Sequence, residues 1–135
     1  MIRKPFPIAF AIALALSLPL AGPADAADSA GDVPEATRTK VLTTIKEYVE
    51  RDVAIKQSFL IVDSRTGEPL KLAFDHVHQG VKPEGGGYLA CVDFRDAAGK
   101  VYDVDVVVDV TGAEPRVTAV HLHKVGGEAV AREQQ

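Results

Sequence analysis

The chain has 135 residues, of which 25% are charged and 47% are hydrophobic, with a single cysteine and a formal net charge of −4. One cysteine cannot form an intramolecular disulfide, so packing has to stabilise the fold, and this length allows one small domain with a single hydrophobic core. The acidic balance argues against nucleic acid as a partner, because binding to phosphates needs an excess of Lys and Arg.

The N-terminal 26 residues have the pattern of a secretory signal peptide. Arg3 and Lys4 precede an apolar run at 8–20, and Ala-Asp-Ala at 24–26 supplies the small residues of a cleavage site. A retained membrane anchor is the alternative, but the run is shorter than the ~20 apolar residues that span a bilayer. We therefore expect an exported protein, periplasmic or extracellular, with no membrane partner after cleavage. The mature chain would keep 109 of the 135 residues.

Residues 27–31 are small and polar, and we expect them to form a disordered N-terminus of the mature chain. The segment 32–56 predicts an amphipathic helix, with Asp32 as the N-cap and Glu35 as the reciprocal residue of a capping box. Apolar residues then follow the i, i+3, i+4, i+7 spacing of one helix face: Val41, Leu42, Ile45, Tyr48, Val49 and Val53. Charged residues occupy the other face, which we expect to be solvated.

From Phe59 the apolar spacing changes to the period of two that is typical of strands. Strands are expected at 59–62, 70–77 and 116–125, around a central hairpin at 88–110 that turns near Gly99, with a glycine-rich loop at 79–87 and a polar tail at 126–135. The sequence therefore predicts a single α+β domain at 32–125. In it, one helix lies across an antiparallel meander of about five strands, cystatin-like or NTF2-like in outline.

The hairpin determines which side chains share a face of the sheet. Pairing Phe94 with Tyr102 places the apolar residues of both runs beneath the helix, Val104 and Val106 among them, and the acidic residues on an outer, solvated side. The last strand adds His121 and His123 to this outer side. Leu122 between them is expected on the apolar inner face, and neighbouring residues of a strand point to opposite faces. The predicted outer patch consists of Asp75, Cys91, Asp93, Asp103, Asp105, His121 and His123, with Cys91 opposite Asp105 and Asp93 opposite Asp103.

Two binding interpretations of this patch stay open. In the first, the protein is a non-enzymatic binding module without a cofactor, which recognises an unidentified protein or small ligand through the patch or through the loop around Gly85. In the second, His121 and His123 bind a divalent transition metal together with Asp103 or Asp105. Imidazoles two residues apart on a strand point the same way, as such a site requires.

A second His-x-His pair, His76 and His78, is expected on the opposite side of the sheet. Phe74 is expected on the inner face of that strand, and His76 and His78 are two and four residues further on, so regular alternation places them on the same face. Together with Tyr48 and Tyr88 they would line a pocket between helix and sheet. Such a pocket would suit a small enzyme, which is a further alternative.

We do not expect catalysis at the outer patch. Cys91, His121 and Asp105 are the residue types of a nucleophile, a general base and an orienting carboxylate. An open sheet face, however, excludes little water and presents no helix N-terminus to an oxyanion. The hydrolase patterns G-x-S-x-G and H-E-x-x-H are also absent from the sequence.

Several segments resemble a group of short exported bacterial proteins of unknown function: C-V-D-F at 91–94, Y-D-V-D at 102–105, H-K-V at 123–125 and the turn D-x-x-T-G-E at 63–68. The resemblance covers about 34–127 and implies an exported α+β class without an activity. The segment 99–106 is also similar to the G-x-x-Y-x-V-x-V pattern of PepSY domains.

Overall fold

The computed structural model describes residues 32–131. The predicted signal peptide, the predicted disordered segment at 27–31 and residues 132–135 therefore lie outside the described residues. Within them, one helix precedes seven strands: α1 (Glu35–Lys56), β1 (Phe59–Val62), β2 (Pro69–Val77), β3 (Lys82–Glu84), β4 (Gly87–Arg95), β5 (Val101–Asp109), β6 (Arg116–Val125) and β7 (Glu128–Ala129). No helix in this part of the chain is long and apolar enough to cross a membrane.

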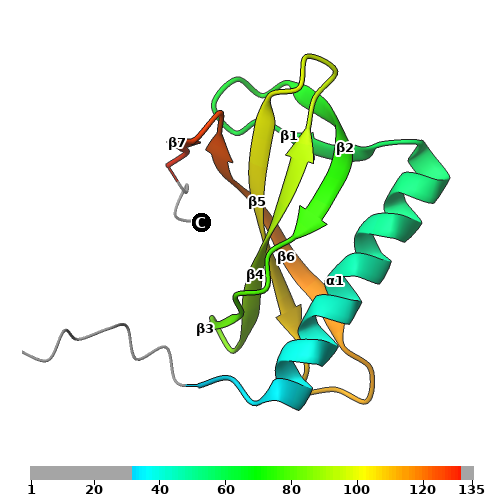
Figure 1. Ribbon diagram of the computed structural model, residues 1–135, viewed down its shortest axis with the longest axis vertical. Coiled ribbons are helices and arrows are strands. Elements are labelled where there is room, and N and C mark those ends of the chain that lie inside the picture. The colour runs from blue at the N-terminus through cyan, green and yellow to red at the C-terminus, as the bar shows by residue number, and fades with distance from the viewer. Residues whose placement is uncertain (1–31, 132–135) are drawn as a thin grey trace, which may run out of the picture.

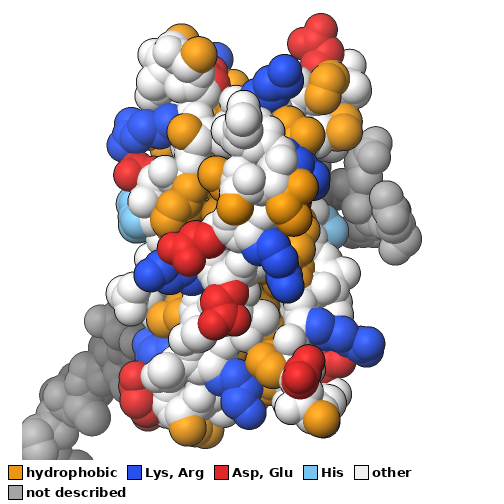
Figure 2. Space-filling view, turned by 90° about the vertical axis from the view of Figure 1, so that its right-hand side faces the viewer, with side chains coloured by type: hydrophobic (Ala, Val, Ile, Leu, Met, Phe, Trp, Pro, Cys, Tyr) orange, Lys and Arg blue, Asp and Glu red, His pale blue; other side chains and the backbone are white. Residues whose placement is uncertain are grey.

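All strand pairs are antiparallel, in the order β1-β2-β4-β5-β6-β7, and β3 pairs with β4. The predicted α+β class is thus confirmed: α1 lies along one face of a curled antiparallel sheet (Figure 1). The outer side of α1 carries interspersed positive and negative side chains, as expected of a solvated face (Figure 2).

The helix begins differently from its prediction. Pro34 is the N-cap residue, and no side chain caps the helix, so the predicted Asp32 cap with Glu35 in a capping box is wrong. Proline suits a helix start because its fixed φ matches the helix and the missing N–H would have no helical partner there. At the other end, Gln57 adopts a left-handed conformation and its N–H donates to the carbonyl of Val53.

Two short strands occupy segments that were predicted to be irregular. β3 lies inside the glycine-rich loop and forms a hairpin with β4 through Gly85 and Gly86, which have φ of 51° and 83°. β7 lies inside the predicted polar tail and pairs with β6 after a turn at 126–127, so that prediction is wrong for residues 128–129. The described sheet therefore has seven strands and not about five.

The hydrophobic core lies between α1 and the inner face of the sheet. Val41, Ile45 and Val49 of α1 are fully buried. Phe59 of β1 stacks on Phe94 of β4, with ring centroids 4.5 Å apart. The strands contribute further buried residues to this core, including Leu72, Val92, Val104, Val106 and Val108. The predicted burial of Val104 and Val106 is confirmed.

The predicted hairpin register is also confirmed, since Cys91 lies opposite Asp105 and Asp93 lies opposite Asp103. The outer face is nevertheless not uniformly solvated. Asp105 is 1% exposed, so the prediction of a water-facing Asp105 is wrong. Leu89 on the same outer face is also buried. The sheet is curled, and the chain after β6 turns back along that strand, where the N–H of Val130 donates to the carbonyl of His123 (Figure 1).

Candidate metal centre

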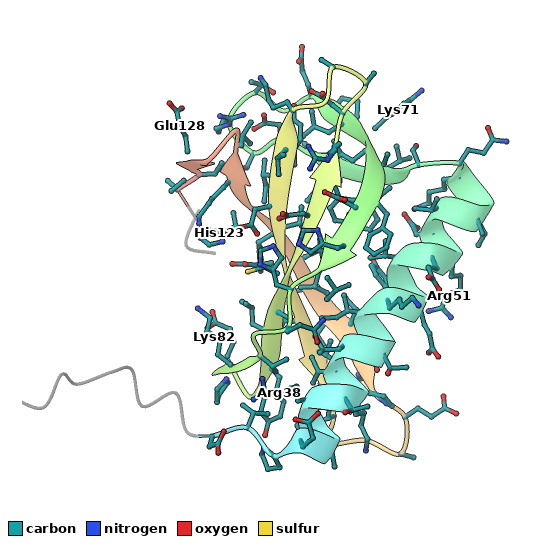
Figure 3. All side chains as sticks on the ribbon, in the orientation of Figure 1. Arg38, Arg51, Lys71, Lys82, His123 and Glu128 are labelled. Atoms are coloured by element: carbon teal, nitrogen blue, oxygen red, sulfur yellow. The ribbon has the colours of Figure 1, made fainter. Side chains whose placement is uncertain are left out.

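Seven donor side chains gather on the outer face of the four central strands β2, β4, β5 and β6. We call this set the polar patch; it consists of His76, His78, Cys91, Asp93, Asp103, Asp105 and His123. Figure 3 shows His123 on the side of the sheet that faces away from α1, between Glu128 and Lys82. The patch falls into two groups of converging ligand atoms.

A bulge in β2 brings His76 and His78 to the patch. Phe74 pairs with Phe94, but His76 already pairs with Asp93, so Asp75 is an extra residue in the strand. One extra residue reverses which side chains face outward beyond it. The predicted inner-face position of His76 and His78 is therefore wrong, and both histidines lie with Asp93 on the outer face.

A second bulge, in β6, positions His123. Lys124 pairs with Asp103 and Leu122 pairs with Val104, which leaves His123 as the unpaired residue between them. Leu122 stays buried in the core, and the imidazole of His123 is directed at the carboxylate of Asp105. Both bulges therefore flank the patch, one in each of its two outer strands.

The first group, which we call site A, consists of Cys91, Asp103, Asp105 and His123. One ligand atom from each residue lies within 4.8 Å of those of the others. His123 Nδ1 is 3.3 Å from Asp105 Oδ1 and 3.8 Å from Asp103 Oδ1, and Cys91 Sγ is 2.9 Å from Asp105 Oδ1. Ligands of one tetrahedral zinc ion, bound at about 2.0–2.3 Å, are about 3.3–3.5 Å apart. The separation of His123 Nδ1 from Asp105 Oδ1 matches this spacing, whereas the hydrogen-bonded Cys91 Sγ and Asp105 Oδ1 are closer and would have to move apart by about 0.5 Å to share one ion.

The electrostatics of site A favour a cation. Asp105 is almost fully buried and accepts a hydrogen bond from the thiol of Cys91, and a cation would add opposite charge to this buried carboxylate. Buried atoms His123 Nδ1 and Asp103 Oδ1 have no hydrogen-bond partner among the described residues. The nearby carboxylate oxygens are close to Nδ1 but are not aligned with an N–H bond. Burial, and then the hydrogen bond to Asp105, raise the pKa of the Cys91 thiol far above its usual range.

The second group, site B, consists of His76, His78 and Asp93. His78 Nε2 is 3.0 Å from Asp93 Oδ1, and His76 Nε2 is 3.8 Å from Asp93 Oδ2. The two imidazoles stack with centroids 5.0 Å apart. His78 Nε2 is buried and has no aligned hydrogen-bond partner in the described part of the chain, despite the close carboxylate.

Two residues of the predicted patch lie outside both groups. Asp75 forms an ion pair with Arg95 at 3.0 Å and lies 3.7 Å from the His76 ring. His121 is opposite Asp105 in the register, but its side chain is exposed and is not part of site A. Of the predicted metal set of His121, His123 and Asp103 or Asp105, His123 and both aspartates therefore group with Cys91, whereas His121 does not.

The predicted pocket between helix and sheet is not formed by its four residues. His76 and His78 lie on the outer face with Asp93. Tyr48 packs edge-on against Phe59 in the core, with ring centroids 6.3 Å apart. Tyr88 lines an open hollow elsewhere, beside the glycine-rich loop at 83–87 and residues 110–111.

Comparison of the chain with known protein families, with curated proteins and with solved structures finds no significant match. The arguments for a function therefore come from the geometry and chemistry of the polar patch.

Proposed function

We propose that the protein is an exported, non-enzymatic module that binds a divalent transition-metal ion of the zinc class in site A. One observation supports this most strongly: four side chains of metal-binding type converge, and one of them is a carboxylate that is 1% exposed. Export rests on the signal-peptide pattern at 1–26. The cystatin-like or NTF2-like outline, like the resemblance to exported proteins, remains a hypothesis about class and adds no activity.

The donor set determines the class of ion. A thiolate and an imidazole favour zinc and its neighbours over calcium or magnesium, which prefer oxygen ligands alone. Site A supplies four protein ligands, Cys91, Asp103, Asp105 and His123. Four protein ligands complete a tetrahedral shell, which is the arrangement of structural and storage sites; a catalytic zinc keeps one position for water or substrate.

The environment of Cys91 supports a binding role over nucleophilic catalysis. A cysteine nucleophile acts as the thiolate, and a thiol with a raised pKa stays protonated at neutral pH. The predicted base, His121, is exposed and lies outside the group that contains Cys91. A positively charged ion bound at Asp105 would compensate the thiolate as well as the carboxylates.

Calorimetric titration of metal-free protein with Zn²⁺ tests this proposal. We expect Cys91→Ser and His123→Gln each to weaken the binding of this ion by at least about 100-fold, because each removes one of four ligands. His121→Gln is the matched control, since it changes an exposed histidine on the same strand, and it should leave the affinity unchanged. Zinc binding that is insensitive to Cys91→Ser and His123→Gln would contradict the proposal, and a wild type that binds no zinc would favour recognition of a protein or small ligand without a metal.

A further inference from the structure

We infer that site B is a second metal site, so that the polar patch holds a pair of divalent transition-metal ions. This inference extends the proposed function and relies on it for the ion in site A. The ion in site B is bound by the imidazoles of His76 and His78 and by the carboxylate of Asp93.

No single ion can be bound by all the donors of both sites. Two ligands of the same ion are at most about 4.6 Å apart, when bonds of up to 2.3 Å point in opposite directions. The donors of sites A and B form separate groups, because their ligand atoms do not all lie within 4.8 Å of one another. The sites are nonetheless neighbours, since Asp93 of site B is directly opposite Asp103 of site A on the adjacent strand.

The charge of the patch is compatible with two ions. Asp93, Asp103 and Asp105 contribute three negative charges, and the first two face each other across neighbouring strands, where like charges are destabilising. Lys124 lies opposite Asp103 in the register and offsets one of them. With Cys91 deprotonated, the three carboxylates, the thiolate and Lys124 sum to −3, so one divalent ion leaves a net charge of −1 and two leave +1.

The two bulges support a site that extends over both groups. A regular β2 would place His76 on the helix side; in β6, where regular alternation already points His123 outward, the bulge leaves His123 unpaired between Leu122 and Lys124. The bulges lie at the same level of the sheet, since His76 pairs with Asp93, Asp93 with Asp103, and Asp103 with Lys124 beside His123. Bulges of this kind redirect side chains next to functional sites.

The sites differ in how firmly they hold an ion. Site A offers four ligands around a buried carboxylate, whereas the side chains of His76 and His78 are 57% and 41% exposed. Site B has three protein ligands and therefore keeps coordination positions open to water or to an external donor. The structure thus assigns a retained ion to site A and an exchangeable ion to site B.

Native mass spectrometry with Zn²⁺, supported by calorimetry, tests this assignment. We expect two ions per wild-type chain, one ion in the double variant His76→Gln/His78→Gln, and one ion in Cys91→Ser/His123→Gln. His121→Gln should keep two. A dilute chelator should remove the ion of site B from the wild type at least about 10-fold faster than the ion of site A. Far-UV circular dichroism checks that each variant is folded.

The possible results separate the two proposals. A wild type that binds one ion, lost in Cys91→Ser/His123→Gln and kept in His76→Gln/His78→Gln, would overturn the second site and leave the first. One ion with the opposite sensitivity would support site B and overturn site A. A wild type that binds no ion, or whose ions are insensitive to both double variants, would contradict both.

Discussion

The two faces of the sheet follow different rules. On the inner face, apolar side chains alternate regularly, pack against α1 and are fully buried, as at Val104 and Val106. On the outer face, the same strands depart from regular pairing at three positions, two of them beside the polar patch, and bury a carboxylate beside a thiol. The comparison teaches that the inner face provides stability, while the outer face assembles polar groups that the fold alone does not require.

The largest effect on stability is expected from the inner face. Phe94 is fully buried and stacks on Phe59, so Phe94→Ala should lower the free energy of unfolding by about 3–5 kcal/mol. Chemical denaturation measures this loss. Val62, a more exposed residue of β1, is the control, and its change to Ala should have an effect within about 0.5 kcal/mol. Equal losses at the two positions would show that the core is not where the structure places it.

On the outer face, removing a buried group should not destabilise the metal-free protein as it does in the core. Asp105→Asn keeps the shape of the side chain and removes a buried charge, so metal-free protein should lose little stability or gain about 1 kcal/mol. In excess Zn²⁺ the same variant should be less stable than wild type, because it lacks a ligand of site A. Thermal unfolding with and without Zn²⁺ measures both. A large loss in metal-free Asp105→Asn would mean that this carboxylate stabilises the fold through protein contacts alone.

A smaller effect is expected at the turn between β1 and β2, away from the patch. The guanidinium of Arg65 donates to the carboxylate of Asp63 and lowers its pKa below the ordinary value. A carboxyl group with a lowered pKa in the folded state contributes stability that is present above its unfolded pKa of about 4 and is lost as the pH falls through the folded value.

Asp63→Asn should therefore lower the stability at pH 7 by about 1 kcal/mol and reduce the loss of stability between pH 5 and pH 2. Urea unfolding across that pH range measures the change. Arg65→Ala should have a similar effect, and the double variant should be no worse than either single variant. Fully additive losses would show that the two side chains do not act through each other.

Much of the inner face was predictable, because strict alternation and a hairpin turn at Gly99 fix the register between β4 and β5. The bulges in β2 and β6 could not be predicted from the sequence. Neither Asp75 nor His123 has a glycine or proline beside it, so nothing local indicates an extra residue, and the reversal of His76 appears only through cross-strand pairing. The additional strands left a signal, since Gly85-Gly86 and Gly126-Gly127 are pairs of the kind that form tight hairpins.

The candidate site was predicted in part for the same reason. The confirmed register places Cys91, Asp103 and Asp105 on one side of the sheet. Alternation along the last strand predicted His123 on the same side. The burial of Asp105 could not be predicted from alternation, because it depends on the side chains that pack around it on the outer face, Cys91 and His123 among them. Cys91 was therefore predicted to lie on a solvated surface and was not included among the expected metal ligands.

The absorption spectrum of Co²⁺-loaded protein tests the central claim most directly, because a cobalt–thiolate bond gives a charge-transfer band that oxygen and nitrogen ligands do not give. We predict that Co²⁺ added to metal-free wild type produces this band, which saturates at one equivalent in site A, remains in His121→Gln and disappears in Cys91→Ser. Absence of the band from folded wild-type protein, or its persistence in Cys91→Ser, would contradict the assignment of the buried patch as a metal centre.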